Sequence, residues 1–400
     1  MKVLVLGGAG DMGRMGVTTL LNAPNIASVT IADKNYELAK AFLNLVDSDR
    51  LSAVETDITD HSRLVDLISN HDLVLNTVGP YFRFGKMVIE ACIEAQKPGV
   101  DICDDWEPML EALELSEKAK KAGVPLIVGM GASPGMSNLM TVLACQDLDE
   151  VDEIVTAFGL SGNVQFAEKQ PHHVSRKRLM ALAAGQPNAA MEHLLHECIG
   201  KIPTFSDGKI IEIDSLTEAA PVSFPGFKDA YACHIGHPEP VTLPRTIKAK
   251  AISNVMFTSR IVTDVLREYV RKIMNNEITV QEAASAFEKE FREILKMPTV
   301  MAETSGFPPI LNVTVSGLRN NKRKKIAIGL LKAPHGLMAG VTSIPLAVAG
   351  LMILEGKVQK RGVLTPEESI DPEEFFNRYA AYCGKDLSAR DVLLKKEIDL

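Results

Sequence analysis

Short apolar runs alternate with stretches of helical spacing along residues 1–136. The runs suit buried strands, and they are Val3–Leu6, Ser28–Ala32, Val54–Ile58, Leu73–Asn76, Val100–Cys103 and Val124–Val128. The stretches between them predict helices, which end near Leu21 and cover 60–70, 84–96 and 108–122. Strands that alternate with helices in this way predict an α/β fold with a parallel, doubly wound sheet.

The pattern changes after about residue 137. The later strand-like runs are Glu153–Leu160 and Ile310–Val315, and the helical stretches are 172–200, 258–296, Ser343–Leu354 and 371–383. The middle of the chain is therefore predicted to form a second, α+β domain with an antiparallel or mixed sheet, which we take as the substrate domain.

A glycine-rich turn lies between the first predicted strand and the first predicted helix. Its sequence, Gly8-Ala9-Gly10-Asp11-Met12-Gly13, matches G-x-G-x-x-G, and Asp33 ends the second strand 20 residues after Gly13. Gly8 permits a tight turn, Gly10 lets the backbone approach a pyrophosphate, and Gly13 lets the helix pack closely on the strand. The helix N-terminus offers N–H groups to the phosphates. This order of elements predicts a Rossmann-type dinucleotide-binding unit.

The acid that ends the second strand bears on the choice of cofactor. The Asp33 carboxylate would hold two ribose hydroxyls and repel a 2′-phosphate, which favours NAD; the neighbouring Lys34 could blunt that repulsion, so NADP stays possible. Asp57 and Ile58 would lie near the adenine, and a crevice loop begins at Thr77. The predicted cofactor contacts are Gly8, Gly10, Asp11, Met12, Gly13, Asp33, Lys34, Asp57, Ile58, Thr77, Val78, Gly79 and Pro80.

Composition narrows the class of protein. The chain has 400 residues, which suggests two domains, and a net charge of −8, which gives no general attraction to nucleic acid or anionic membrane. Its six cysteines contain no C-x-x-C pair, the start shows no signal-like segment, and the longest apolar stretch, Ile344–Leu354, is too short to span a bilayer. We expect a soluble cytoplasmic protein with no nucleic-acid and no membrane partner.

Several segments carry a family likeness. The nucleotide turn, "NTVGPYFRFGKMVIEAC", "VDIC", "GMGASPGMSN" and "TSIPLAVAGLMILEGKVQKRGVLTPEE" resemble the saccharopine dehydrogenase-like oxidoreductases. The resemblance implies a discontinuous Rossmann domain over 1–136 and 336–400, and a substrate domain over 137–335 that commonly forms a homodimer interface. It also implies hydride transfer between a nicotinamide cofactor and an amine-bearing carbon of an amino acid, in the group that includes saccharopine reductase, lysine 6-dehydrogenase and carboxynorspermidine dehydrogenase.

The resemblance extends to particular positions. Gly79, Pro80 and Tyr81 match the loop beside the nicotinamide ribose, so Tyr81 joins the candidate catalytic residues, and Asp101 matches the acid of the family's Tyr-x-Asp strand end. The aromatic residue of that motif is Gly99 here. The family's Arg-Tyr-Pro-Gly-His stretch is not evident, and a proline-punctuated segment over 237–245 stands in its place.

Amine chemistry needs an acid or base for the nitrogen's proton, an anion for an ammonium and a cation for a carboxylate. Asp104 and Asp105 follow a predicted central strand and could meet the amine, although an aspartate there could equally cap the next helix. Trp106 could wall the pocket or simply pack. Arg245 could grip a carboxylate and His237 could exchange protons, with Glu239 nearby; the alternative is an ordinary rigid surface loop.

Three further features complete the candidates. His172-His173 have no partner at ligand spacing, so we predict no metal. The basic stretch Gly317–Lys325 suits a solvated hairpin tip, and His335 is a reserve candidate for the active site.

The sequence therefore predicts an NAD-dependent amine or amino-acid dehydrogenase whose substrate is a small molecule. Two alternatives stay open at this point: a catalytically silent nucleotide-binding regulator, and a reductase of a carbonyl or lipid substrate on the same fold.

Overall fold

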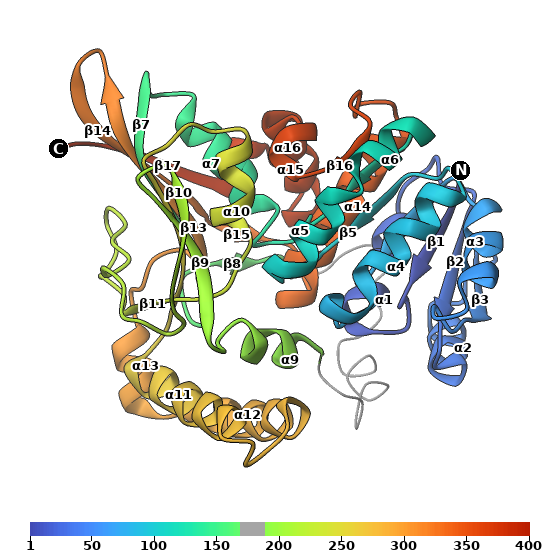
Figure 1. Cartoon of the computed structure of the whole chain (residues 1–400), viewed down its shortest axis with the longest axis horizontal. Helices are drawn as coiled ribbons and strands as arrows, with labels where there is room; N and C mark the ends of the chain where they lie inside the picture. Colours follow the sequence, from blue (N-terminus) through green and yellow to red (C-terminus); the bar gives the residue numbers. More distant parts are fainter. Residues whose placement is uncertain (169–188) are drawn as a thin grey trace. The chain divides into compact units, whose positions relative to one another are not determined.

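The structure is a computed structural model, and it describes residues 1–168 and 189–400. The described chain divides into two compact units (Figure 1). The first unit comprises Met1–Met136, 166–168 and Ala333–Ala389, and the second comprises Ser137–Gln165, 189–332 and Arg390–Leu400. Each unit is therefore assembled from segments that are far apart in the sequence.

The first unit is built on a parallel sheet with strand order β16-β6-β5-β4-β1-β2-β3. Its strands are β1 (Lys2–Leu6), β2 (Ser28–Asp33), β3 (Leu51–Glu55), β4 (Leu73–Asn76), β5 (Gly99–Asp101), β6 (Pro125–Ile127) and β16 (Gly362–Leu364). The order reverses direction between β1 and β4, which is where a doubly wound sheet opens its ligand crevice. The predicted α/β, doubly wound fold is confirmed.

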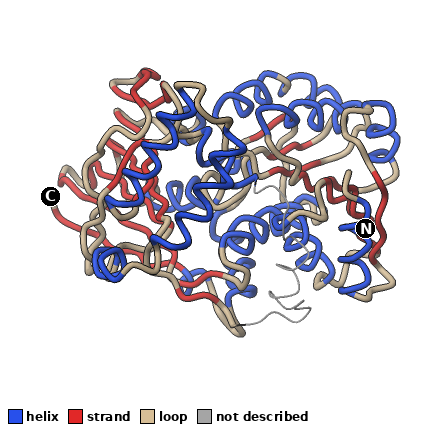
Figure 2. Tube along the Cα trace, turned by 90° about the horizontal axis from the view of Figure 1, so that it is seen from below, coloured by secondary structure: helices blue, strands red, loops and turns tan. Residues whose placement is uncertain are grey.

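Helices lie on both sides of these strands (Figure 2). They are α1 (Asp11–Leu21), α2 (Tyr36–Val46), α3 (His61–Ser69), α4 (Tyr81–Glu94), α5 (Trp106–Glu114), α6 (Ser116–Ala122), α14 (Met338–Leu354), α15 (Pro366–Ser369) and α16 (Pro372–Cys383). The late helix α14 packs against α1, β4, β5 and α16. A Cβ at Gly350 of α14 would lie 2.8 Å from Leu73 Cδ2 and 2.9 Å from Leu75 Cδ2, so glycine is what lets this helix approach β4 so closely.

The second unit contains a mixed sheet with strand order β10-β9-β12-β7-β13-β14-β17, and β11 pairs with β12. Its strands are β7 (Glu150–Gly159), β9 (Lys201–Ser206), β10 (Lys209–Asp214), β11 (Ala232–His234), β12 (Ala251–Phe257), β13 (Leu311–Arg319), β14 (Lys322–Leu330) and β17 (Leu393–Asp399). Strands β7 and β12 run parallel, whereas the other described pairs are antiparallel. The prediction of a mixed sheet in an α+β unit is confirmed.

Helices complete the second unit. They are α7 (Met136–Cys145), α9 (Ala189–His196), α10 (Glu239–Thr242), α11 (Arg260–Met274), α12 (Val280–Ile294) and α13 (Pro298–Thr304), followed late in the chain by α17 (Ala389–Val392). Helix α12 packs against α9 and α11, and their apolar faces meet in one core around Leu195, Leu266 and Phe287. The short pair β8 (Gln165–Phe166) and β15 (Lys332–Ala333) lies where the chain changes unit.

Some predicted bounds are wrong. The third strand ends at Glu55, because Val54–Ile58 owes its apolar look to Ile58, which is buried in the loop that follows. The helix expected over 108–122 is two helices that meet at Leu115. Helix α2 was not predicted, and the part of the expected helix 172–200 that precedes residue 189 lies outside the described residues.

The end of the chain needs a second correction. Residues 336–400 were assigned to the nucleotide-binding domain, but β17 pairs antiparallel with β14, so Arg390–Leu400 belong to the second unit. The pairing joins opposite charges, because Lys324 on β14 contacts Glu397 at 2.7 Å and also pairs with Asp399. Strand β17 covers what would otherwise be an open edge of the second sheet.

Candidate active site

The glycine turn connects β1 to α1 and is as tightly packed as the motif requires. Gly7 has a φ of +71°, so it, rather than Gly8, supplies the left-handed residue of the turn. A Cβ on Gly8 would lie 2.9 Å from Ile31 Cγ2, and one on Gly13 would overlap Gly7 O and Gly8 Cα. Gly10 is the N-cap of α1 and makes no side-chain cap. The first N–H groups of α1 are thus not occupied by a capping side chain, as phosphate binding requires.

Arg14 braces this turn from inside the protein, a role that no sequence motif indicated. Its side chain is 2% exposed, and its guanidinium contacts Ala9 O and the Asp11 carboxylate. Burial lowers the pKa of Arg14, while the charges of Asp11 and Asp33 oppose that shift. The predicted contact Asp11 is exposed, at the first position of α1, and the next position is Met12.

Asp33 is tied to the same turn. One of its carboxylate oxygens accepts a hydrogen bond from Ala9 N at 2.9 Å, and the other accepts one from Asn35 N at 2.9 Å. Burial raises the pKa of Asp33, and these backbone bonds act against the rise. A carboxylate has about four acceptor positions, so Asp33 retains room for ribose hydroxyls.

Lys34 and Asp57 form an ion pair beside Asp33, with Nζ and Oδ2 2.9 Å apart. Asp57 also accepts bonds from the Thr59 hydroxyl at 2.7 Å and the Thr59 N–H at 3.0 Å. These bonds and Lys34 hold the pKa of Asp57 well below its usual range. An open hollow here is lined by Asp33, Lys34, Asn35, Tyr36, Glu37 and Glu55.

The loop after β4 is joined to the glycine turn. The Thr77 hydroxyl donates to Leu6 O at 2.9 Å and to Gly7 O at 3.2 Å. Val78 N donates to the Asn76 side chain, and the Gly79–Pro80 peptide is cis. The structure thus brings this predicted crevice loop next to the predicted phosphate turn.

Tyr81 begins α4 and is buried, 4% exposed. Its hydroxyl donates to Asn76 O at 2.9 Å. Burial, together with the charge of Asp101, raises the pKa of Tyr81 well above its ordinary value. This geometry gives Tyr81 a bracing role at the end of β4, and its predicted catalytic role stays a prediction.

Asp101 clamps two loops at the carboxyl edge of the sheet. Its Oδ1 accepts bonds from Cys103 N at 3.0 Å and Gly129 N at 2.8 Å, and its backbone carbonyl accepts one from Met130 N. Burial raises its pKa to about 6. The resemblance pointed to Asp101 as a strand-end acid; its role here is to join the loops that follow β5 and β6.

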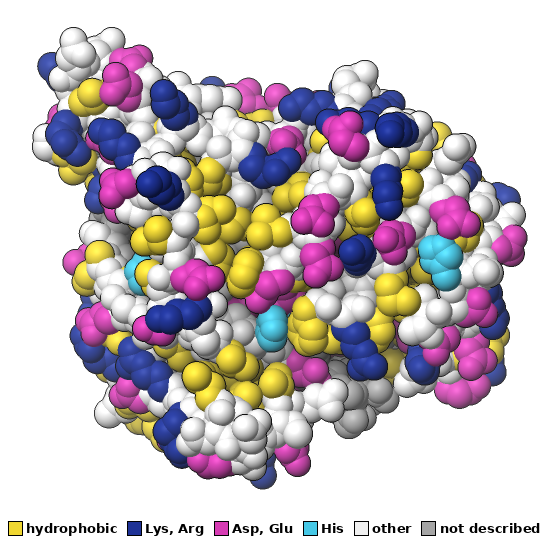
Figure 3. Space-filling model, in the orientation of Figure 1, with side chains coloured by type: hydrophobic (Ala, Val, Ile, Leu, Met, Phe, Trp, Pro, Cys, Tyr) yellow, Lys and Arg dark blue, Asp and Glu magenta, His cyan; other side chains and the backbone are white. Residues whose placement is uncertain are grey.

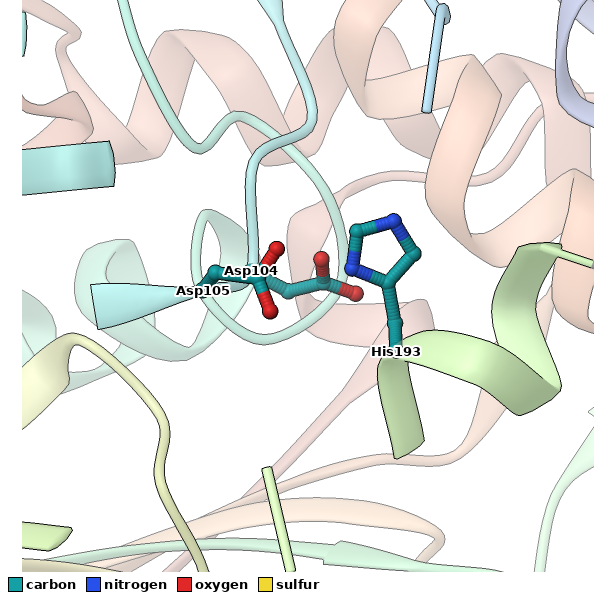
Figure 4. A group of neighbouring side chains, drawn as sticks. All are labelled: Asp104, Asp105 and His193. Atoms are coloured by element: carbon teal, nitrogen blue, oxygen red, sulfur yellow. The ribbon is translucent and has the colours of Figure 1, made fainter. Parts of the chain in front are cut away.

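Asp104 and Asp105 lie in the loop between β5 and α5 (Figure 4). Asp105 is fully buried and occupies the N-cap position of α5, yet its side chain makes no capping hydrogen bond. The alternative of a capping side chain therefore does not hold for Asp105, although the residue stands at the N-cap position. Asp104 lies near enough to Tyr81 and Asp101 for its charge to raise the pKa of both. Figure 4 also draws His193, which is a residue of α9 in the second unit.

His237 lies in a buried polar cluster of the second unit. Its Nε2 is 3.1 Å from Glu197 and its Nδ1 is 3.5 Å from Glu239, while its ring stacks on Phe158 with centroids 4.9 Å apart. Ser137 donates to Glu239 at 2.8 Å. Burial acts to lower the pKa of His237, but the two carboxylates outweigh it and hold the pKa well above 6.5. This disfavours the predicted proton exchange near neutral pH.

Arg245 has a different environment from His237. The segment expected to be a stiff loop folds as α10 and a short 3₁₀ helix, Leu243–Arg245. Arg245 ends that helix and is exposed, whereas Glu239 at the start of α10 is fully buried. The candidates His237 and Arg245 therefore lie in one segment of the chain, but His237 is buried whereas Arg245 is exposed.

The basic stretch forms the tip of the β13–β14 hairpin, with Asn320 and Asn321 at positive φ. Its cations have acidic neighbours: Arg319 contacts Glu397 at 2.9 Å and Arg323 contacts Asp152 at 3.3 Å. The face drawn in Figure 3 likewise intersperses Lys and Arg with Asp and Glu. The expectation of no nucleic-acid partner stays a prediction.

Comparison with known families draws on both units. The family model described as "Saccharopine dehydrogenase NADP binding domain" matches residues 3–127, and "Saccharopine dehydrogenase C-terminal domain" matches residues 131–384. The chain belongs to the saccharopine dehydrogenase family. The resemblance seen in the sequence is thereby confirmed, and this family member is an NAD(P)-binding oxidoreductase.

Relatives of this saccharopine dehydrogenase family member cover nearly its whole length. It is 22% identical to carboxyaminopropylagmatine dehydrogenase of Synechocystis over 94% of each chain, and 22% identical to carboxynorspermidine synthase of Vibrio alginolyticus over 94% of each chain. Apo saccharopine dehydrogenase (L-Glu forming) from Saccharomyces cerevisiae has a TM-score of 0.64 at 15% identity, over 99% of each chain. That structural likeness shows a shared fold.

The residues of this family member fit the dinucleotide that the fold implies. The uncapped start of α1 and the glycines that a Cβ would obstruct suit the pyrophosphate, and the Asp33 carboxylate suits the adenosine ribose. The chemistry supplied by a bound nicotinamide is hydride exchange.

The sequence did not indicate Gly7, Arg14, Asn76, Glu197 and Ser137. Only Gly7, which directly precedes the motif, carried a local signal. Within the described residues, no helix of this family member is both long and apolar enough to cross a membrane.

Two histidine-containing segments remain. His172-His173 lie outside the described residues, so the expectation of no metal there stays a prediction. His335 lies in the segment before α14, next to Gly336 with a φ of +109°, and is partly exposed.

Proposed function

We propose that the protein is an NAD-dependent dehydrogenase that transfers a hydride at an amine-bearing carbon of an amino acid, one related to lysine or saccharopine. The observation that carries this proposal is the pair of carboxylates, Asp104 and Asp105, in the loop after β5. That loop lies at the carboxyl edge of a parallel sheet, the edge at which such folds bind cofactor and substrate. Paired acids at this edge suit a cationic amine.

The names of the relatives support the same class of substrate. Carboxyaminopropylagmatine and carboxynorspermidine each combine a carboxyl group with amines, as saccharopine does. A substrate of this kind offers a carbon that bears nitrogen, and a carboxylate for a cation to hold. Lysine, saccharopine and carboxylated polyamines are therefore the first compounds to try.

Each candidate residue has a proposed task. Asp104 or Asp105 would bind the ammonium and accept its proton as the amine is oxidised to an imine. The exposed guanidinium of Arg245 would hold the substrate carboxylate in a two-pronged contact. His237, held protonated between Glu197 and Glu239, would position its segment rather than act as a base at neutral pH.

The proposed preference for NAD rests on the charges around the ribose position. Asp33 faces the glycine turn through Ala9 N, and Glu37 and Glu55 line the same hollow. Three carboxylates would repel a 2′-phosphate. Titration with NADH and NADPH should give a lower Kd for NADH, and Asp33→Ala should narrow the difference; tighter binding of NADPH by the unmodified protein would contradict the preference.

The test of the catalytic assignment is a substrate screen followed by variants. The protein with NAD is supplied with L-lysine, saccharopine, other amino acids and carboxylated polyamines, and the absorbance of reduced cofactor is followed. Asp104→Ala or Asp105→Ala, and Arg245→Ala, should lower kcat/KM for the active compound by about 10²–10⁴-fold. Glu114→Gln, which removes an exposed carboxylate from α5, is the matched control.

The outcomes separate the alternatives. Near-parental activity in all these variants would show that the site is assigned wrongly. Binding of NADH without turnover of any amine or imine would favour a nucleotide-binding regulator, and turnover of carbonyl or lipid substrates alone would favour a reductase of that class.

A further inference from the structure

The hollow beside Asp33 contains one cation among the six residues that line it. That cation is Lys34, and it shares the hollow with the carboxylates of Asp33, Glu37 and Glu55. Glu37 is itself paired with Lys40, at 2.9 Å. A 2′-phosphate that entered this hollow would therefore depend on Lys34 for its main attractive contact.

Lys34 is already paired. Its Nζ lies 2.9 Å from Asp57 Oδ2, and Asp57 in turn is fixed through its other oxygen, Oδ1, by the Thr59 hydroxyl and the Thr59 N–H. A carboxylate anchored by two such bonds has little rotamer freedom left to lose when it binds an ammonium group. The pair is thus ordered at the Asp57 end, where the side chain is 45% exposed, whereas the Lys34 side chain is 82% exposed.

We propose that Asp57 is a specificity-determining residue, which discriminates against a 2′-phosphorylated cofactor by engaging the Lys34 ammonium. This inference rests on the proposed function, namely on binding of a nicotinamide dinucleotide at the glycine turn. Asp57 acts through Lys34, so it is a positioning residue.

The size of the effect follows from the exposure of the pair. An exposed ion pair alters an equilibrium by a factor of up to about five, and a carboxylate near the phosphate adds a screened repulsion. Asp57→Asn keeps the Oδ1 acceptor for Thr59 and replaces only the oxygen that faces Lys34. We expect the ratio Kd(NADPH)/Kd(NADH) to fall about three- to tenfold in this variant.

The experiment measures both Kd values by fluorescence titration of the whole protein and its variants, each checked for an unchanged thermal midpoint. Lys34→Ala should raise the ratio, and Asp57→Asn should have less than about a twofold effect on it when Lys34 is already alanine. Asp66→Asn, which removes an exposed carboxylate from α3, is the matched control and should leave the ratio unchanged.

Each contrary result has its own meaning. An unchanged ratio in Asp57→Asn overturns the inference, and so does an equal fall in the Lys34→Ala background, because Asp57 would then act without Lys34. An equal fall in Asp66→Asn would show a general charge effect and would also overturn it. Failure of the unmodified protein to bind either cofactor would overturn the proposed function as well, which distinguishes the two failures.

Discussion

In the first unit a buried carboxyl group is held by the backbone, whereas in the second unit two buried carboxylates are held by side chains. Asp101 accepts from the N–H groups of Cys103 and Gly129. Glu197 and Glu239 instead flank His237, and Ser137 donates to Glu239. Both arrangements answer the same need, because a buried acid without partners is strongly destabilising.

The difference lies in what each arrangement depends on. The N–H groups of Cys103 and Gly129 belong to the backbone, so the Asp101 clamp needs the acid and the path of two loops rather than particular donor side chains. The His237 cluster needs four particular side chains from segments up to about 100 residues apart, Ser137 and Glu239 among them. Loss of one member removes a partner from buried charged groups, so the second unit should be the more sensitive to substitution.

The largest expected effect is that of His237→Ala. It leaves Glu197 and Glu239 facing each other's charge inside the protein, and removal of one partner of a buried ionic group costs about 3–5 kcal/mol. Urea unfolding of the variant should show a decrease of this size in the free energy of unfolding. His61→Ala, which removes an exposed histidine 2.8 Å from Glu94, is the control and should cost less than about 1 kcal/mol. Equal losses of unfolding free energy in the two variants would show that the buried cluster stabilises the protein no more than the exposed pair does.

Two substitutions at Asp101 should show whether its stabilising effect comes from the oxygen that accepts the backbone hydrogen bonds or from its negative charge. Both of its accepted bonds reach the same oxygen, Oδ1. Asp101→Asn keeps such an oxygen and should cost less than about 1.5 kcal/mol, whereas Asp101→Ala leaves two buried N–H groups without their acceptor and should cost about 2–4 kcal/mol. Denaturant midpoints of the two variants measure the difference. If asparagine were as damaging as alanine, the negative charge rather than the acceptor would be what matters.

The two clusters should also respond to pH in different windows. The pKa of Asp101 is raised to about 6 from 3.8, so its contribution to stability is present below about pH 4 and is lost as the pH rises through 6. The pKa of His237 is raised above 6.5, so its contribution is present below pH 6.5 and is lost at higher pH, as the histidine deprotonates. A shift of about two pKa units corresponds to about 3 kcal/mol at most for Asp101. In urea unfolding from pH 4 to 9, Asp101→Asn should flatten the acidic slope and His237→Gln the alkaline one; the reverse assignment would refute this account.

The smallest expected effect is that of Tyr81→Phe. The variant loses the hydrogen bond to Asn76 O and should be less stable by about 1 kcal/mol, with turnover close to that of the parent. Thermal unfolding and steady-state kinetics are measured together. If turnover instead fell by about two orders of magnitude, the loss expected for a general acid or base, while stability stayed unchanged, Tyr81 would be catalytic rather than a brace.

The same contrast explains which features of the structure could be predicted from the sequence. The first unit follows local rules, since apolar runs, a glycine turn and an acid at fixed spacing predicted β1, β2 and the nucleotide turn. Asp33 reaches the turn because neighbouring parallel strands end at one edge of the sheet, and its contact with a ribose stays a prediction. The exact glycine of the turn, Gly7, was missed because the motif names the residues after it.

The second unit was less predictable because its determining contacts are not local. Neither the β9–β10 hairpin nor β17 has a long apolar run, since β10 is mostly exposed and β17, an edge strand, carries three consecutive charged residues, Lys395–Glu397. His237 was selected from its own segment, and nothing in that segment indicates that Glu197 lies 3.1 Å away. Burial of such a pair is a tertiary property.

The packing of α14 has a consequence for the order in which the chain can mature during synthesis. The helix that covers β4 and β5 begins at Met338, more than 260 residues after β4 leaves the ribosome. Until then, Leu73 and Leu75, against which Gly350 finally packs, have no covering helix on that face. The nascent chain must therefore carry an open apolar sheet face through most of its translation. Apolar surface that stays exposed in this way is prone to aggregation and is the kind of surface that chaperones bind.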